Sequence, residues 1–265
     1  MADIDLSGDA GDTKDRNFVT ALARGLDVLR AFRPNEVELT NTDFSERTGL
    51  PKPTVSRLTH TLCKLDYLVA DPRTGTYRLG AGVLQLGFGV LSGMDIGERA
   101  SDLMRNLRNG PNSYITVAMA ERHRLDVVYV AVQPSRENVA LTMQIGSRLP
   151  LFFSAIGRAI LVAMSEAEIK SVFELVAREM PEKEAECRQS YAQALQEFQK
   201  DGYCRGYGDW RRDVNGIAVP VYSLNGTRVY GFNVGGPSFH VKKKQLETYY
   251  AKHLKEAAKV LNCGT

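Results

Sequence analysis

A basic, hydroxyl-rich segment at residues 53–64 is the part of the sequence best suited to contact a polyanion. At helical period, one face of this segment carries six polar side chains and no carboxylate before Asp66: Thr54, Ser56, Arg57, Thr59, His60 and Lys64. Hydroxyls and cations can hold phosphate oxygens, and arginine can pair with the edge of a guanine through two hydrogen bonds. An ordinary solvated helix face is the alternative, so the neighbouring elements decide between the two interpretations.

Two short helices joined by a tight turn are predicted to position this face. The first has Leu39 and Phe44 facing inward and ends at Gly49, because glycine readily adopts the left-handed conformation. Pro53 suits the first position of the second helix, which places Lys52 in the turn. The opposite face of the second helix is an apolar stripe: Val55, Leu58, Leu62 and Leu65. A helix docked by one face with an acid-free polar face at its N-terminal end is typical of a DNA recognition helix.

A third helix and a hairpin complete the predicted domain. The helix ends at Pro34 and carries an apolar stripe: Leu22, Leu26, Leu29 and Phe32. The hairpin consists of β-prone runs at residues 66–70 and 76–79 around a Pro/Gly turn, and it carries Arg73 and Arg78. These elements predict a winged helix-turn-helix at residues 17–80. Its nine Lys/Arg against seven Asp/Glu leave a net charge of only +2, so we expect two copies to act together on a two-fold symmetric DNA site.

The composition excludes several classes of protein. The 265 residues are long enough for two domains, and 43% hydrophobic with 25% charged residues is typical of a soluble globular protein. The four cysteines form no CxxC pair, and no apolar stretch approaches the ~20 residues of a membrane span, so we expect a cytoplasmic protein without a membrane partner. No GxSxG, HExxH or GxxxxGK[ST] motif occurs, and the four histidines lack metal-ligand spacing. We therefore expect neither an enzyme nor a metal or cofactor site.

The remainder of the chain predicts an α+β domain. Residues 1–16, with five aspartates, are expected to be a disordered tail. A linker helix is expected at residues 81–95, with an interruption near Gly93. It leads to an effector domain at residues 96–265, which opens with a helix at 96–108. Strands are expected at 114–119, 126–132, 141–145, 217–222 and 229–234, with a charged turn at 121–124 and a hairpin at Asn225-Gly226. Helices are expected at 155–164, 166–178, 187–200 and 246–261. This order of elements disfavours a doubly wound sheet.

Five motifs in chain order resemble the IclR family of bacterial transcriptional regulators: LARGLDVLRAF at 22–32, GLPKPTVSRL at 49–58, GTYRLG at 75–80, GSRLPLFFSAIGRAIL at 146–161 and GGP at 235–237. The likeness runs over roughly residues 18 to 262. The resemblance implies a winged helix-turn-helix, a linker helix and a C-terminal GAF-like domain that binds a small-molecule effector. It also implies dimers, often paired into tetramers, on palindromic double-stranded promoter DNA.

The resemblance assigns DNA contacts to residues that the helical pattern already singled out. Lys52, Thr54, Ser56 and Arg57 match the DNA-facing segment of the family, and Arg73 matches the wing. Arg57 is the best candidate for a guanine contact, while the other residues of the segment are placed to hold phosphates. His60 lies on the same face and joins the predicted DNA-binding set. An exposed turn cation without a DNA contact is the alternative for Arg73.

The effector pocket implied by the resemblance has three parts. They are the helix start Ser154-Ala155-Ile156-Gly157, whose N–H groups favour an anion, the strand segment Asn215-Gly216-Ile217, and the strand from Asn233 to Gly235. The chain departs from the common family pattern after Tyr203, where an acidic pair is frequent, at Gly216, where cysteine is frequent, and at Asn233 and Gly235, where serines are frequent. Smaller side chains near Tyr207 and Trp210 suggest room for a flat ligand, although Trp210 is also a candidate packing residue.

An aromatic carboxylate is the effector that these motifs favour. The segments GLDVLRAF and GSRLPLFFSAIGRAIL look most like family members that sense aromatic acids. Arg148 or Arg158 is a possible charge partner for the carboxylate, with a structural salt bridge as the alternative for each. We thus predict a ligand-responsive DNA-binding regulator of an aromatic-compound catabolic operon. A small-molecule sensor or enzyme whose winged domain binds protein is the alternative, and the acid-free face of residues 54–64 argues against it.

Overall fold

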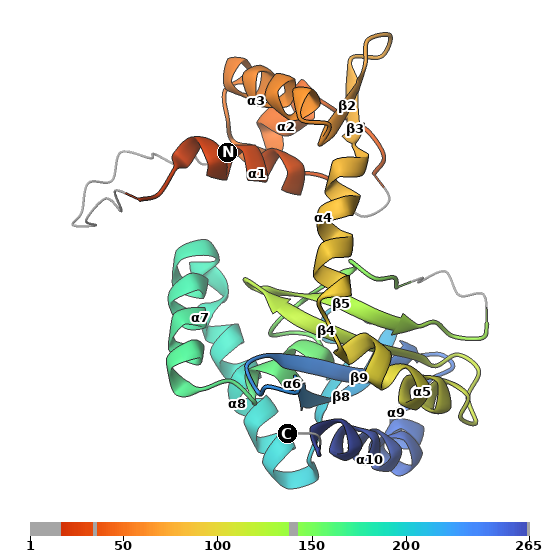
Figure 1. Cartoon of the computed structure of the whole chain (residues 1–265). Coiled ribbons are helices and arrows are strands. Elements are labelled where there is room, and N and C mark those ends of the chain that lie inside the picture. Colours follow the sequence, from red (N-terminus) through yellow and green to blue (C-terminus); the bar gives the residue numbers. More distant parts are fainter. Residues whose placement is uncertain (1–16, 34–35, 138–142, 264–265) are drawn as a thin grey trace. The chain divides into compact units, whose positions relative to one another are not determined.

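The computed structural model describes residues 17–33, 36–137 and 143–263. The chain divides into two compact units, residues 1–89 and 90–265, and each unit is described by itself (Figure 1). The predicted tail at residues 1–16 lies outside the described residues, as does Pro34. The first helix ends at Arg30, several residues before that proline.

Unit one contains three helices and a small antiparallel sheet. Its elements are α1 (Thr20–Arg30), β1 (Leu39–Thr40), α2 (Asn41–Thr48), α3 (Lys52–Lys64), β2 (Leu68–Asp71) and β3 (Thr76–Leu79). β3 lies between β1 and β2, and Leu68 pairs with Leu79 in the hairpin. The helix-turn-helix and the hairpin after it are present as predicted.

Local hydrogen bonds fix the two ends of α2. Thr40 and Asp43 form a capping box, in which the Asp43 N–H donates to Thr40 Oγ1 at 3.2 Å and the Thr40 N–H donates to Asp43 Oδ2 at 2.7 Å. Gly49 ends the helix with φ of +70°, as the sequence predicted. The prediction that Lys52 belongs to the turn is wrong: Pro51 adopts the extended conformation that ends the turn, and α3 begins at Lys52.

The core of unit one confirms part of the predicted apolar pattern. Leu39, Phe44 and Val55 are buried, and Phe44 packs edge-on against Phe32 with ring centroids 5.5 Å apart. Thr59, which we placed on the polar face, is fully buried, and its hydroxyl donates to the Ser56 carbonyl at 3.1 Å. Three apolar residues predicted to face inward are instead exposed: Leu22, Leu26 and Leu65. Three short helices bury only a narrow stripe each, so the remaining apolar residues stay at the surface.

Unit two is built on a six-stranded antiparallel sheet with strand order β6-β5-β4-β9-β8-β7. The strands are β4 (Thr116–His123), β5 (Asp126–Gln133), β6 (Arg148–Pro150), β7 (Cys204–Tyr207), β8 (Val214–Tyr222) and β9 (Val229–Pro237). The predicted turn at residues 121–124 is mostly strand, because β4 continues to His123. The chain reverses at Arg124, which has φ of +57°, and at the residue after it. Residues 143–145 of the predicted strand 141–145 are not a strand, and residues 141–142 lie outside the described part. The strand that pairs with β5 at this edge of the sheet is instead β6.

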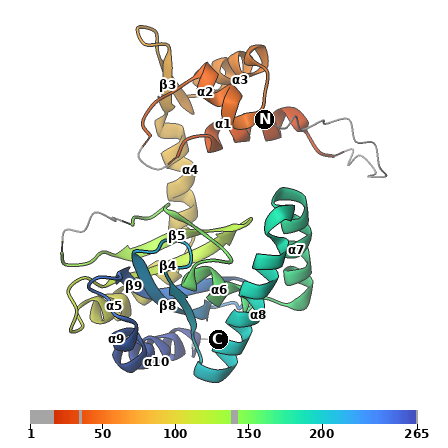
Figure 2. The ribbon, with the colours of Figure 1, turned by 180° about the vertical axis from the view of Figure 1, so that it is seen from behind.

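Helices cover both faces of this sheet (Figure 2). They are α5 (Ile96–Arg108), α6 (Ala155–Leu161), α7 (Glu166–Glu179), α8 (Glu184–Asp201), α9 (Lys243–Gln245), a π-helical turn (Leu246–Tyr250) and α10 (Ala251–Asn262). One core joins α5 and α10 to alternate strand residues such as Ile217 and Val234; the other joins α6, α7 and α8 to the intervening ones, such as Ala118 and Ala218. The predicted α+β class is confirmed.

Helix α4 (Ala81–Ser92) spans the division between the units. The helix ends near Gly93 as predicted, and α5 begins at Ile96. The short helix η1 (Pro181–Lys183) connects α7 to α8. None of the helices in the described ranges has the length and apolarity needed to cross a bilayer.

A close approach of α6 to the chain before it generates a stability prediction. A methyl group at Gly157 would lie 2.1 Å from the Leu151 carbonyl oxygen, whereas one at Gly25 in α1 would meet nothing closer than 4.0 Å. We expect Gly157→Ala to lower the free energy of unfolding by about 1–3 kcal/mol through overpacking. Gly25→Ala should raise it by up to about 1 kcal/mol. Urea denaturation followed by Trp210 fluorescence and by circular dichroism measures both changes; equal destabilisation by the two variants would contradict the prediction.

Candidate functional site

The N-terminal half of α3 presents the predicted DNA-binding residues. Lys52, Ser56, Arg57 and His60 are exposed, and Thr54 is half-buried. No partner for the Arg57 guanidinium occurs among the residues that the structure describes, so its donors are available to a ligand. Val55 is buried beneath this face and anchors the helix to the core of unit one.

The tip of the hairpin holds Arg73 against Asp71. The Arg73 side chain is 88% exposed, and its Nη2 lies 3.2 Å from Asp71 Oδ2. The backbone N–H of Arg73 also donates to Asp71 Oδ1 at 2.9 Å. These bonds hold the pKa of Asp71 below its usual range. Arg73 is therefore an exposed turn cation in the free chain, and a phosphate would have to compete with the half-buried carboxylate of Asp71 for it.

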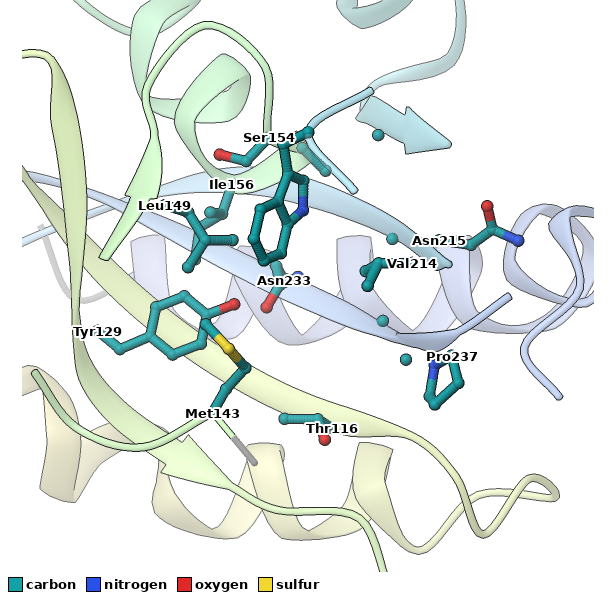
Figure 3. Close-up of a pocket in the computed structure, with 16 residues that line it drawn as sticks. Thr116, Tyr129, Met143, Leu149, Ser154, Ile156, Val214, Asn215, Asn233 and Pro237 are labelled. Atoms are coloured by element: carbon teal, nitrogen blue, oxygen red, sulfur yellow. The ribbon is translucent and has the colours of Figure 1, made fainter. Parts of the chain in front are cut away.

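A cavity of about 50 Å³ lies in unit two between the start of α6 and the face of the sheet (Figure 3). Sixteen residues from all six strands, α6 and the neighbouring loops line it: Thr116, Tyr129, Met143, Leu149, Ser154, Ala155, Ile156, Gly206, Trp210, Val214, Asn215, Gly216, Asn233, Gly235, Gly236 and Pro237. Most of the wall is apolar. Among the residues that the structure describes, the lining contains no lysine, arginine, histidine, aspartate or glutamate.

A row of glycines creates the space for this cavity. Gly206 on β7 pairs with Gly216 on β8, which pairs with Gly235 on β9. A methyl group at Gly206 would lie 2.7 Å from the amide nitrogen of Ala155, so the glycine allows the sheet to approach the first turn of α6. Next in the row, β4 contributes Thr116 opposite Gly235. Because successive strand residues alternate between faces, the row leaves one face of the sheet hollow at this point.

The polar groups at the cavity are neutral. Ser154 caps α6: its hydroxyl accepts a hydrogen bond from the Gly157 N–H at 3.2 Å and donates to the Pro150 carbonyl at 2.7 Å. Tyr129 is 4% exposed, and burial raises the pKa of its hydroxyl, which stays protonated at neutral pH. Asn233 and Thr116 add a carboxamide and a hydroxyl.

The structure brings seven of the ten predicted effector residues together at the cavity: Ser154, Ala155, Ile156, Trp210, Asn215, Gly216 and Asn233. Ile217 lies in the core on the other face of the sheet, as strand alternation requires. Gly157 does not line the cavity: its Cα faces the Leu151 carbonyl, and its N–H donates to the Ser154 hydroxyl. Arg148 is exposed on the edge strand β6 and does not line the cavity.

Sequence reasoning missed several lining residues, among them Tyr129. The strand that carries Tyr129 was predicted, but one strand alone does not reveal which of its two faces a helix will cover. Five further residues were not predicted as effector contacts: Thr116, Met143, Leu149, Gly206 and Val214. Gly235, Gly236 and Pro237 belong to a motif that the sequence had already singled out.

Comparison with known proteins assigns both units. The model for the IclR helix-turn-helix domain matches residues 21–72, and the model for the C-terminal part of the bacterial transcriptional regulator IclR matches residues 88–262. This chain belongs to the IclR family. An IclR-family transcriptional regulator from Brucella abortus has a solved structure with a TM-score of 0.82 at 44% identity, covering 95% of this chain and 94% of that one.

Two further relatives extend the comparison. The HTH-type transcriptional regulator TsaQ1/TsaQ2 of Comamonas testosteroni is 36% identical over 223 residues, 83% of this chain and 79% of that protein. An IclR homologue from Microbacterium hydrocarbonoxydans, solved in complex with 4-hydroxybenzoate, shares the fold with a TM-score of 0.66 at 22% identity, covering 92% and 98% of the two chains.

Membership of the IclR family decides between the two functional classes that the sequence left open. The chain is a ligand-responsive transcriptional regulator, with a helix-turn-helix unit for DNA and an effector unit for a small molecule. The alternative of an enzyme or sensor with a protein-binding winged domain is not supported, because both matching family models describe a regulator. Among the described residues, no cluster of His, Cys, Asp and Glu could hold a metal ion.

Arg158, the second candidate charge partner, is committed to the interior of this IclR-family effector unit. It is 4% exposed, and its guanidinium donates four hydrogen bonds within the protein: to Phe152 O and Ser190 Oγ at 3.0 Å, to Arg205 O at 2.8 Å and to Asp209 Oδ2 at 2.7 Å. These bonds connect α6 to α8, β7 and the loop that carries Trp210. Arg158 therefore forms a structural salt bridge, the alternative to an effector contact, and it lies outside the cavity lining.

The two candidate arginines are expected to respond differently to the same substitution. Arg158→Met removes a cation that satisfies four buried or half-buried acceptors, and we expect it to lower the free energy of unfolding by about 2–4 kcal/mol. Arg148→Met changes an exposed edge residue, and we expect less than about 0.5 kcal/mol. Thermal and urea denaturation of the two variants measures the difference. Similar stability of both would show that the Arg158 network contributes little.

Proposed function

We propose that this IclR-family regulator binds a palindromic operator as a homodimer, that it controls an aromatic-compound catabolic operon, and that its effector is a small aromatic carboxylate bound in the cavity of unit two. The observation that carries the effector class is the cavity wall, which is apolar and contains Trp210 and Tyr129, with neutral hydrogen-bond donors rather than charges. Such a wall suits a flat, mostly apolar ligand with few polar groups.

The DNA-binding role rests on residues 52–60 of α3 together with the hairpin tip. Arg57 reads a base edge, whereas Lys52, Thr54, Ser56 and His60 position the helix on the phosphate backbone. Arg73 at the hairpin tip makes a further backbone contact. Because the local net charge is small, a single copy binds DNA weakly, and two linked copies are needed for a stable complex.

A homodimer also accounts for apolar surface on unit one. Helix α1 exposes Leu22 by 64%, and α4 exposes Leu84 and Leu86, while no residue of α4 is buried. An apolar helix with no buried side chain is covered by a partner in most soluble proteins. A second copy is the partner that a palindromic site requires. Tetramers would arise from two such dimers.

The carboxylate of the effector has neutral donors available. Residues 154–156 at the start of α6 line the cavity, and the N–H groups of a helix start favour an anion. The homologue from Microbacterium hydrocarbonoxydans is complexed with 4-hydroxybenzoate, a ligand of this class. Since an apolar cavity of about 150 Å³ admits benzene, the present cavity must widen when such a ligand enters. Binding that is linked to a change of conformation is what lets an effector alter DNA affinity.

The DNA contact of Arg57 has a direct test. In gel-shift and footprinting experiments with the DNA upstream of its own gene, Arg57→Ala should weaken binding by about 1–3 kcal/mol and relax preference at one base position of each half-site. Arg30→Ala, which removes an exposed arginine of α1, is the matched control and should bind like the parent protein. Unchanged operator occupancy for Arg57→Ala across a salt series would refute the proposed orientation of α3.

The effector class is tested by calorimetry on the full chain. Hydroxybenzoates should bind and change the gel-shift, and short oxo-acids should not. Trp210→Ala removes the largest aromatic side chain of the cavity and should weaken hydroxybenzoate binding by about 1–3 kcal/mol, because an aromatic contact and its buried area are lost. If only the short oxo-acids bound, the proposed aromatic effector would be wrong.

A further inference from the structure

The hydroxyl of Tyr129 reaches into the cavity without a protein partner. Tyr129 lies on β5 opposite Ala120 of β4, and its hydroxyl is directed toward Asn233 (Figure 3). The ring is buried with Val127 and Leu149 in the core under α6. Among the described residues, no group forms a hydrogen bond with this hydroxyl. A protonated, buried phenol of this kind offers one donor and an acceptor to a ligand.

Asn233 offers complementary groups from the neighbouring part of the sheet. Its Nδ2 atom lies 3.5 Å from the point that a Cβ would occupy at Gly216 and at the same distance from that point at Gly235, so the carboxamide lies over the glycine row. Within the described part of the chain, no residue forms a hydrogen bond with this carboxamide. A carboxamide presents donors and an acceptor at once, and it therefore complements a ligand group that also does both.

The absence of charge in the described lining limits which second polar group a ligand can carry into the cavity. No cationic side chain lines the cavity in the described residues, and Arg158 of α6 is bonded to Asp209 and three other acceptors. A second carboxylate on the ligand would be desolvated with no counter-charge, which is costly. A hydroxyl is uncharged, accepts one hydrogen bond and donates another.

We propose that Tyr129 and Asn233 together select an effector that carries an uncharged hydroxyl on its aromatic ring. This inference rests on the proposed aromatic carboxylate effector and names its second polar group. The ligand hydroxyl accepts from the Tyr129 O–H and donates to Asn233 Oδ1, or the roles are exchanged, and both protein groups are then satisfied. A ligand without the hydroxyl leaves both groups unpaired against the apolar ring, and such an unpaired group lowers affinity by roughly 10- to 100-fold.

Calorimetry with a matched set of probes tests this selection. The full-length protein is titrated with benzoate, 3-hydroxybenzoate and 4-hydroxybenzoate. We expect at least one hydroxybenzoate to bind roughly 10- to 100-fold more tightly than benzoate. Tyr129→Phe, which removes one oxygen atom, should reduce the hydroxybenzoate affinity toward that of benzoate while leaving benzoate binding nearly unchanged. Tyr249→Phe, on a half-exposed tyrosine outside the cavity, should retain the parent preference.

A second variant and a stability measurement keep the outcomes separate. Asn233→Ala should reduce the same preference, and thermal denaturation identifies any variant that loses its fold. If benzoate and the hydroxybenzoates bind equally well, or if Tyr129→Phe weakens all of them by one factor, the inference is overturned and the aromatic carboxylate effector stands. If none of the three binds, the proposed effector class itself is overturned and the inference with it.

Discussion

Strand alternation in the six-stranded sheet of unit two is the constraint on which the cavity depends. One face of the sheet carries large apolar side chains that pack against α5 and α10, and the other carries small ones where α6 approaches. A methyl group at Gly231 would lie 2.5 Å from the side chain and the carbonyl oxygen of Ile156, so α6 can approach this closely only over glycine. Where the small residues continue past the start of α6, the space is left as a cavity.

The buried guanidinium of Arg158 links that cavity to the surrounding elements. A charge in this position is stable only because four acceptors surround it, one of which is the carboxylate of Asp209. Asp209 immediately precedes Trp210, which lines the cavity. The wall of the cavity and the packing of α6 on α8 are thus held by one hydrogen-bonded group.

Unit one relies on short-range interactions instead. The capping box at Thr40, the left-handed Gly49 and the bond from the Ser45 hydroxyl to the Leu50 carbonyl at 2.7 Å set the angle between α2 and α3. In the described part of unit one, the core beneath them contains five buried apolar residues. A core of this size leaves apolar side chains of α1 and α4 exposed, and this surplus is what a partner chain would cover.

The sequence by itself determined the elements whose signals are local. Turn residues, helix caps and apolar periodicity located the helix-turn-helix, the hairpin, the break near Gly93 and most helices of unit two, because each signal acts over a few residues. Seven of the ten predicted effector residues also lie at the cavity, since they belong to motifs that resemble the family. Only the tertiary structure decided which face of each strand α6 covers. Tyr129 therefore points into the cavity, while Ile217 points to the other face of the sheet. The tertiary structure also decided that Arg158 is a buried structural group and that Leu22 is exposed. Those properties arise from contacts between segments far apart in the chain, and no local pattern of residues encodes which segments will meet.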